Sequence, residues 1–242
     1  MAAGVENAFD RDVERFGSYL YTRDDRLSTR LATGRGLKMV AETGVFAGRT
    51  VVDIGCGDGH LSVRLFDAVR PAAVTGVDVA ERAVEAARER AGDRPMTFRV
   101  GSAYDLPLEA DCADVALFLG VLHHLDDPAR AIREGFRVAP TVVIYEPNGY
   151  NPGLKVIEKA SSYHREHEER SYPAAVLRAW LQGAGGEIVH ERFGGFVPMF
   201  APDLLARAMK LTEPLVERTP LRKVGCAVYL AVARRPESSA SS

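Results

Sequence analysis

The sequence lacks the features of a secreted, membrane-spanning or nucleic-acid-binding protein. None of its stretches approaches the roughly 18 consecutive apolar residues of a transmembrane helix, and the opening residues MAAGVENAFDRDVERF contain no apolar core of the signal-peptide type. Dense runs of Lys and Arg are absent as well, because 31 basic residues are balanced by 33 acidic ones. We therefore expect a cytoplasmic protein without a membrane or nucleic-acid partner.

Cysteine is scarce and metal-binding patterns are weak. Cys56, Cys112 and Cys226 form neither a CxxC pair nor a zinc spacing, so we expect reduced, buried thiols. His164 and His167 could share a metal with Glu168, but the stretch YHREHEER is not HExxH and has no clear further ligand. A solvated helical face is the favoured interpretation, and no metal site is expected.

What the sequence does contain is an alternation of strand-like and helix-like runs. Strands are expected over 50–55, 72–79, 96–101, 113–120, 141–147, 187–193 and 225–235, and helices over 60–69, 81–92, 127–138 and 174–185. This alternation is typical of βαβ units and a parallel sheet. We expect one α/β domain over residues 1–235, with a disordered tail at 236–242.

Two segments interrupt the alternation. Residues 149–173 and 194–223 are too long for simple connections, so we expect each to be an inserted segment carrying a helix. The first could form a wall or lid over a bound molecule. The aromatic and sulfur side chains around the start of the second are expected to pack beneath it rather than line a pocket: Phe193, Phe196, Met199 and Phe200.

The stretch VVDIGCGDGH, residues 51–60, predicts a strand, a glycine loop and a helix. This arrangement lets a nucleotide-like ligand lie against backbone N–H groups at a helix N-terminus. Asp58 is the expected N-cap of that helix. Because His60 stands where a dinucleotide fingerprint needs its third glycine, the pattern disfavours a nicotinamide-dependent oxidoreductase.

Asp78 ends the second predicted strand, about 20 residues beyond the glycine loop. A carboxylate there can accept hydrogen bonds from both hydroxyl groups of a ribose. Alternatively, Asp78 could only cap the next helix. With the glycine loop ahead of it, ribose binding is the favoured role.

Taken together, VVDIGCGDG, GVDVAERAVEAA, VGSAYDLPLEADCADVALFLGVLHHLDD and IYEPN resemble the class I S-adenosylmethionine-dependent methyltransferases, in particular their small-molecule branch. The resemblance covers residues 47–148 in order. It implies a Rossmann-like, seven-stranded, mostly parallel sheet with helices on both faces and an antiparallel C-terminal strand. It also implies S-adenosylmethionine as the cofactor, lying across the carboxyl ends of the strands.

The resemblance also assigns roles to individual residues. Gly55, Gly57 and Gly59 would lie beside the methionyl part of the cofactor, with Asp53 ordering the loop. The remaining cofactor contacts would be Asp78 on the ribose, Val79 on the adenine ring, Ser102 and Ala103 near the adenine amino group, and the Gly120 carbonyl on the ammonium group. Ser102 stands where the family more often has Asp.

The N-terminal residues 1–45 are expected to be a helical cover. Comparable enzymes often use such a segment to close over the cofactor. Tyr21, with Tyr19 and Arg26, could then meet the carboxylate of the cofactor, although an ordinary amphipathic helix would explain these residues equally well.

His123 and His124 follow the fourth predicted strand. A sulfonium methyl group is already an electrophile, so the protein must align the acceptor, exclude water and, for a hydroxyl or acidic carbon, accept a proton. Imidazole suits that task near neutral pH. His124 is the first choice as base and His123 the second, although such histidines could also only shape the pocket.

We therefore expect a methyltransferase that transfers a methyl group directly to an oxygen or carbon atom, or to a nitrogen atom, of a small-molecule acceptor. The alternative is a non-catalytic protein that binds S-adenosylmethionine or S-adenosylhomocysteine as a regulatory or scaffold module. The sequence leaves the acceptor and the oligomeric state open.

Overall fold

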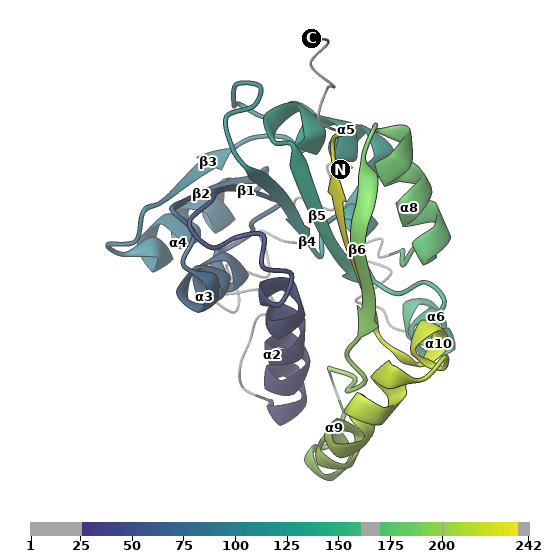
Figure 1. The fold of residues 1–242 in the computed structure, drawn as a ribbon. Helices are drawn as coiled ribbons and strands as arrows, with labels where there is room; N and C mark the ends of the chain where they lie inside the picture. The colour runs from purple at the N-terminus through teal and green to yellow at the C-terminus, as the bar shows by residue number, and fades with distance from the viewer. Residues whose placement is uncertain (1–25, 161–169, 200, 237–242) are drawn as a thin grey trace.

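The computed structural model describes residues 26–160, 170–199 and 201–236, and its centre is one twisted seven-stranded sheet (Figure 1). The strand order is β3-β2-β1-β4-β5-β7-β6. Every neighbouring pair is parallel except β5 with β7 and β6 with β7, so β7 alone runs against the other strands. The strands are β1 Thr50–Ile54, β2 Ala73–Asp78, β3 Met96–Val100, β4 Val115–Leu119, β5 Thr141–Pro147, β6 Glu187–Gly194 and β7 Val228–Arg234.

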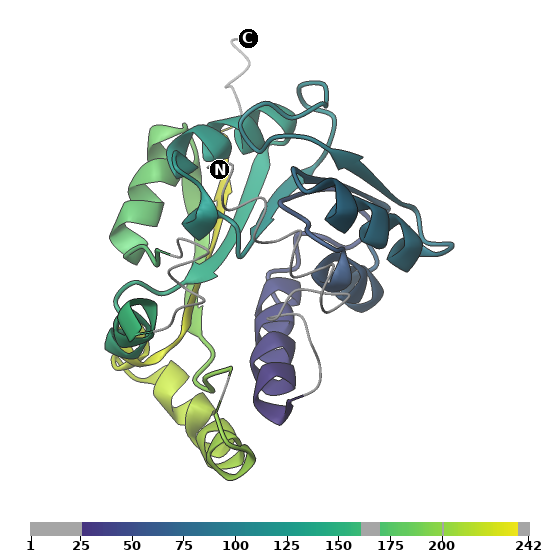
Figure 2. The ribbon, with the colours of Figure 1, turned by 180° about the vertical axis from the view of Figure 1, so that it is seen from behind.

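Helices cover both faces of this sheet (Figures 1 and 2). One face carries α2 Leu27–Ala41, α3 His60–Val69 and α4 Glu81–Ala91, and the other carries α5 Pro128–Val138 and α8 Ala174–Gly183. The remaining described elements are the short 3₁₀ helix η2 Leu122–His124, α6 Pro152–Ala160, α9 Asp203–Arg218 and α10 Arg222–Gly225.

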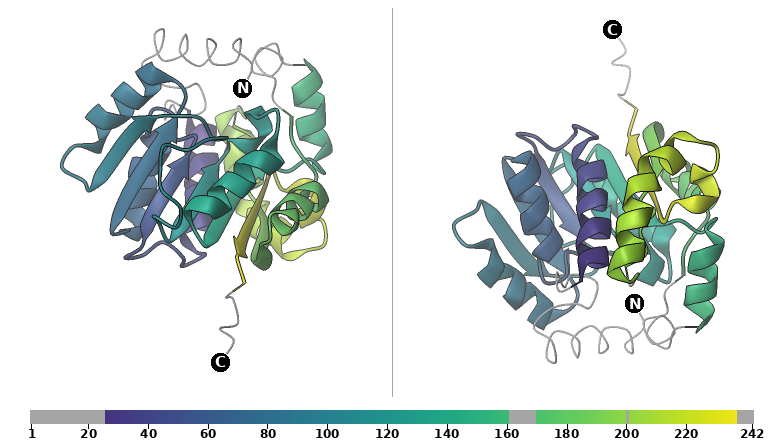
Figure 3. Two further views of the ribbon diagram at one scale, coloured as in Figure 1. Left: turned by 90° about the horizontal axis from the view of Figure 1, so that it is seen from above. Right: turned by 90° about the horizontal axis from the view of Figure 1, so that it is seen from below.

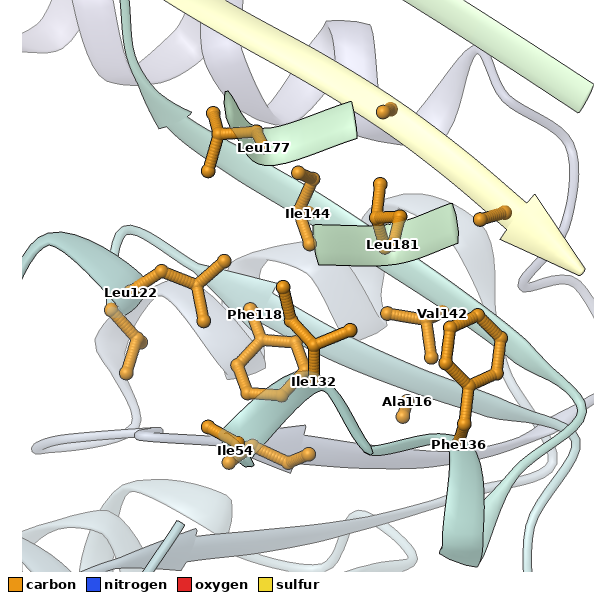
Figure 4. Close-up of a cluster of buried hydrophobic side chains, with 14 of the residues drawn as sticks. Ile54, Ala116, Phe118, Leu122, Ile132, Phe136, Val142, Ile144, Leu177 and Leu181 are labelled. Carbon is orange, nitrogen blue, oxygen red and sulfur yellow. The ribbon is translucent and has the colours of Figure 1, made fainter. Parts of the chain in front are cut away.

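Side-chain alternation along the strands explains why both faces are covered. On β4, Ala116 and Phe118 belong to one buried cluster, whereas Val115 and Leu117 belong to the other. A strand that is apolar on both sides must be buried on both sides. Figure 4 shows the first cluster, in which Phe118 lies near Ile132 of α5 and Leu177 of α8 contributes from the adjacent helix layer.

The fold predicted from the sequence is confirmed, including the antiparallel last strand. Two local predictions are wrong. Gly59, not Asp58, is the N-cap of α3, because the chain enters this helix in the left-handed conformation that glycine favours. Cys112 is exposed, since it lies in the turn before β4, whereas Cys56 and Cys226 are buried as expected.

The two predicted insertions contain helices at the carboxyl edge of the sheet. The described part of the first insertion holds α6, and the second holds α9 and α10. Figure 3 shows α2 and α9 side by side, and Figure 1 shows that both extend below the sheet. Among the described residues, no helix is long and apolar enough to cross a membrane.

Candidate active site

The glycine loop connects β1 to α3 at the carboxyl edge of the sheet. Gly55, Gly57 and Gly59 all have positive φ angles, of 76°, 53° and 71°. A Cβ atom on Gly55 would lie 2.5 Å from Val121, and one on Gly59 would lie 2.8 Å from the Cβ of Ala87. These two positions therefore need glycine both for the backbone conformation and for the close packing around the loop.

Asp78 fixes this loop from the neighbouring strand. Its Oδ2 accepts a hydrogen bond of 2.8 Å from the Gly57 N–H, and its Oδ1 accepts one of 3.0 Å from the Ala80 N–H at the start of α4. The second bond matches the helix-capping alternative. Because a carboxylate offers about four acceptor positions, these two backbone bonds are compatible with a further contact to a ligand hydroxyl.

Asp53 lies beneath the loop and is almost completely buried. Its Oδ2 accepts a hydrogen bond of 2.6 Å from the Ser62 hydroxyl, which joins β1 to α3 across the glycine loop. Its Oδ1 has no partner among the described residues. Burial, with Asp78 nearby, raises the pKa of Asp53 to about 6, although the Ser62 hydrogen bond opposes this rise.

Glu146 organises the other half of the site. This residue near the end of β5 is 1% exposed, and its Oε1 accepts hydrogen bonds from the backbone N–H groups of Val121 and Leu122, at 2.9 and 2.8 Å. Its Oε2 lies 2.7 Å from Nδ1 of the buried His123. Glu146 therefore holds both the backbone and the first histidine of the segment that follows β4.

Glu146 was not among the residues predicted for the site. Its signals were its place in the motif IYEPN and its charge in a strand that is otherwise nearly apolar, which is unusual because a buried carboxylate needs partners.

His124 lies next to His123 and is half-buried. The two imidazole rings are in contact, with centroids 3.9 Å apart and planes inclined by 44°. The ring of His124 is therefore positioned by a neighbour that Glu146 itself holds. Gly120, just before this segment, has a φ of 73° and donates its N–H to the Tyr145 carbonyl at 2.8 Å.

The remaining predicted contacts lie around the same edge, except those outside the described residues. Val79 follows Asp78 directly. Ser102 is exposed, and its hydroxyl accepts a hydrogen bond of 3.2 Å from the Tyr104 N–H, while Ala103 packs partly against the core. Tyr19, Tyr21, His164, His167, Glu168 and Phe200 lie outside the described residues, within which no cluster of metal-ligating side chains is present.

These features converge because four adjacent strands end together. In the order β2, β1, β4 and β5, their carboxyl ends lead to Asp78, the glycine loop, Gly120 with the histidines, and Glu146. A carboxylate beside a close-packed glycine loop suits a ligand that carries a ribose. The residues present therefore fit an adenosyl cofactor.

Solved structures with this architecture define the class of fold. A structure from Thermotoga maritima, described as a methyltransferase and possible histamine N-methyltransferase, matches with a TM-score of 0.68 at 19% identity, over 95% of this chain and 99% of that one. Magnesium protoporphyrin IX methyltransferase from Synechocystis, solved with bound S-adenosylhomocysteine, matches with a TM-score of 0.63 at 19% identity, over 95% of each chain. The fold is that of the Rossmann-like methyltransferases.

Sequence comparisons identify the family. Residues 52–141 match the family model described as a methyltransferase domain. Ubiquinone biosynthesis O-methyltransferase from Pseudomonas paraeruginosa is 35% identical over 167 residues, which are 62% of this chain and 69% of that protein. The chain belongs to the S-adenosylmethionine-dependent methyltransferases, and its cofactor is S-adenosylmethionine, as the sequence analysis expected.

Other relatives match over shorter segments. The 27-O-demethylrifamycin SV methyltransferase of Amycolatopsis mediterranei is 36% identical over 96 residues, which are 38% of this chain. The chain spans 35% of the length of that relative and 25% of a hydroquinone methyltransferase from rice. The chain thus spans only about a quarter to a third of the length of these two relatives.

Proposed function

We propose that this protein transfers a methyl group from S-adenosylmethionine to an oxygen atom of a small organic acceptor, with carbon and nitrogen as the less favoured acceptor atoms. The observation that carries the proposal is the convergence of the glycine loop, Asp78 and the His123–Glu146 pair at the ends of four adjacent strands. The names of the relatives that act on rifamycin and ubiquinone precursors favour oxygen as the acceptor.

The cofactor supplies an activated methyl group on a sulfonium centre, so the residues of this chain need only bind the cofactor, orient the acceptor and remove its proton. In this proposal, Asp78 would accept hydrogen bonds from the ribose hydroxyl groups, and it also holds the Gly57 backbone N–H in place. The Gly120 carbonyl accepts a hydrogen bond from the ammonium group, and Val79 packs on the adenine ring. Ser102 and Ala103 border the adenine amino group.

His124 is the proposed general base. It is more exposed than His123, whose Nδ1 is engaged by Glu146. A base acts efficiently when a neighbouring group fixes its orientation. In this proposal, Glu146 fixes His123, the ring of His123 supports that of His124, and His124 would accept the proton of an acceptor hydroxyl. The bound cofactor would supply the methyl group to the oxygen and leave as S-adenosylhomocysteine.

Ligand-dependent thermal unfolding tests the cofactor part of this proposal. S-adenosylmethionine or S-adenosylhomocysteine at one hundred times its dissociation constant is expected to stabilise the native protein by about 2.7 kcal/mol, and NAD is expected to have no effect. Asp78→Asn, which keeps one acceptor oxygen, is expected to weaken S-adenosylhomocysteine binding at least about tenfold. Asp93→Asn, which changes an exposed carboxylate, is the matched control. Equal binding by both variants would contradict the role of Asp78.

The catalytic part is tested by measuring S-adenosylhomocysteine formation with a panel of hydroxyl-bearing acceptors. His124→Gln is expected to lower kcat by roughly a hundredfold or more while leaving S-adenosylhomocysteine affinity unchanged. His123 and Glu146 position His124 rather than accept the proton. His123→Gln and Glu146→Gln are therefore expected to lower kcat less than His124→Gln does and to shift the pH profile of kcat. The non-catalytic alternative predicts instead that every acceptor in the panel gives no product.

A further inference from the structure

Helix α9 presents its large apolar side chains to solvent rather than to the protein. Leu204, Leu211 and Leu215 are 82%, 83% and 68% exposed. At 100° per residue these positions fall within about 40° of one another around the helix, so they form one stripe, which we call the leucine stripe. Contiguous apolar patches of this kind on a soluble protein mark a contact surface.

The opposite face of α9 is held to the protein by charge. Glu213 is buried there, at 2% exposure, and the side chain of Glu217 is 7% exposed. Both face Arg35 of α2: the Glu217 carboxylate accepts two hydrogen bonds from its guanidinium group, and Glu213 lies 3.6 Å from its Nε. The leucine stripe is therefore not what attaches α9 to the fold, and its exposure needs a different explanation.

Basic side chains lie along one margin of the leucine stripe and on the helix that follows it. Arg207 and Arg218 lie beside it on the same side of α9, and α10, which follows directly (Figure 1), adds Arg222 and Lys223. All four are exposed, and none of them forms an ion pair within the described parts of the chain. The acidic residues Glu213 and Glu217 are turned inward, and Asp203 in the first turn is the exposed acidic residue of α9, so the four basic side chains outnumber the exposed acidic ones on α9 and α10 although the whole chain carries a net charge of −2.

We propose that the leucine stripe of α9, with its surrounding basic residues, docks the protein on the surface of a membrane that contains anionic lipids. Leucine on one side and Arg or Lys at the margins is the pattern of helices that lie in the membrane interface. Leu221, just before α10, and Val224 of α10 are 63% and 48% exposed and extend the apolar surface beyond the end of α9. The acidic headgroups would supply the negatively charged partners that the four basic side chains lack among the described residues.

A second copy of the chain suits this surface less well. In a twofold contact the same patch meets itself, so Arg207, Arg218, Arg222 and Lys223 would face basic side chains. A binding site for another protein would also be expected to contain the Trp or Tyr anchors of interface hot spots, whereas the large apolar residues here are aliphatic.

The expectation of no membrane partner rested on the lack of a long apolar run in the sequence and on the balanced overall charge, and this proposal is compatible with both. A surface contact requires neither a long apolar run nor a net positive charge, only a local patch. Because α9 follows β6 at the carboxyl edge, docking through it would hold that edge towards the lipid.

Vesicle flotation tests the proposal. The full chain is expected to bind vesicles of equimolar phosphatidylcholine and phosphatidylglycerol, to bind phosphatidylcholine alone much more weakly, and to lose affinity at high salt. Leu204→Gln, Leu211→Gln and Leu215→Gln together should weaken binding at least about a hundredfold, since a buried leucine is worth about tenfold or more. Val189→Thr, at an exposed apolar residue of β6, should leave binding unchanged. Unchanged unfolding midpoints would show that the variants fold.

Two further variants keep the test independent of the triple substitution. Arg207→Gln with Arg218→Gln should weaken binding to the anionic vesicles by about 25-fold, since each basic residue near such a surface contributes about fivefold. Leu211→Trp should show a blue shift of its fluorescence when anionic vesicles are added, whereas Val189→Trp should not.

Three results would overturn the proposal. The wild-type chain could fail to bind either kind of vesicle, or the triple variant could bind as tightly as the wild type. The third is a dimer, seen by analytical ultracentrifugation, that dissociates in the triple variant while no vesicle binding occurs. In that last case the leucine stripe would be the contact between two copies.

Discussion

Gly55 and Gly44 share one backbone conformation, with φ angles of 76° and 70°, but their surroundings differ. A Cβ on Gly55 would meet Val121 at 2.5 Å, whereas one on Gly44 would meet nothing within 4 Å. The pair therefore separates the cost of a left-handed backbone from the cost of close packing in the loop.

Gly44→Ala is expected to lower the free energy of unfolding by about 1–2 kcal/mol, from backbone strain alone. Gly55→Ala is expected to lower it further and to weaken S-adenosylhomocysteine binding, because the loop must shift away from Val121. Urea denaturation and titration calorimetry measure the two effects. If both variants lose equal stability and bind equally well, close packing around Gly55 plays no part in the site.

Asp53 gives the protein a pH-dependent stability of predictable sign. Its pKa is about 6 in the folded protein, against about 3.9 in an unfolded chain. Between these values the folded state binds more protons than the unfolded state, so stability falls as the pH rises from about 4 to about 6 and then levels off.

Removing the carboxylate should remove this pH dependence. The free energy of unfolding of Asp53→Asn, compared with the wild type by urea denaturation across that pH range, is expected to differ progressively, by up to roughly 3 kcal/mol. Asp93→Asn, at an exposed position, should follow the wild-type curve. A difference that stays constant with pH would argue against a protonatable Asp53.

At the scale of elements, Arg35 joins helices α2 and α9, which lie far apart in the sequence. Its side chain is 9% exposed, and Glu217, the nearer of its partners, also accepts a hydrogen bond from the Gly195 N–H. Breaking a buried ion pair from one side leaves an uncompensated charge, which costs more than the pair itself contributes.

Arg35→Met is therefore expected to lower the free energy of unfolding by about 3–5 kcal/mol. Adding Glu213→Gln and Glu217→Gln should restore part of that loss, because the two carboxylates, left with Lys210 and Arg192 as their cationic partners, are then uncharged. Arg49→Met breaks an exposed pair with Asp114 and should cost about 1 kcal/mol or less. Urea denaturation measures the free energy of unfolding of the three variants. Equal losses of this free energy in Arg35→Met and Arg49→Met would contradict the role of Arg35 in holding α9 to α2.

The sequence predicted the bounds of helices and strands better than the contacts that these elements make. Helix α3 and strand β5 have the predicted bounds, because apolar periodicity and glycine positions define them locally. The sequence also predicted a helix in the second insertion, but it could not reveal which side of α9 is buried. That depends on Arg35, 182 positions before Glu217, and pairings at such distance leave no local pattern.

The candidate site was predictable to the same extent. The glycine loop, Asp78 and the histidines stand in short motifs, whereas Glu146 acts through backbone N–H groups that lie 24 and 25 positions earlier in the chain. Asp58 lies one residue before the N-cap position of α3. Its Oδ1 accepts a hydrogen bond of 3.2 Å from the His60 N–H, while Arg90 of α4 binds its Oδ2 and its carbonyl, and these contacts to α4 leave no local pattern.

The order of the strands in the sheet affects how the whole molecule folds during its synthesis. β6 is joined to the sheet only through β7, the last strand, which lies between β5 and β6. While a ribosome synthesises the chain from its N-terminus, β6 therefore emerges with no strand to pair with. Its backbone N–H and C=O groups stay unpaired until residues 228–234 have been made and can form β7. During that time the unpaired strand can add to another chain. Nascent chains of this protein thus have a late interval in which a chaperone that shields strand edges would be most effective.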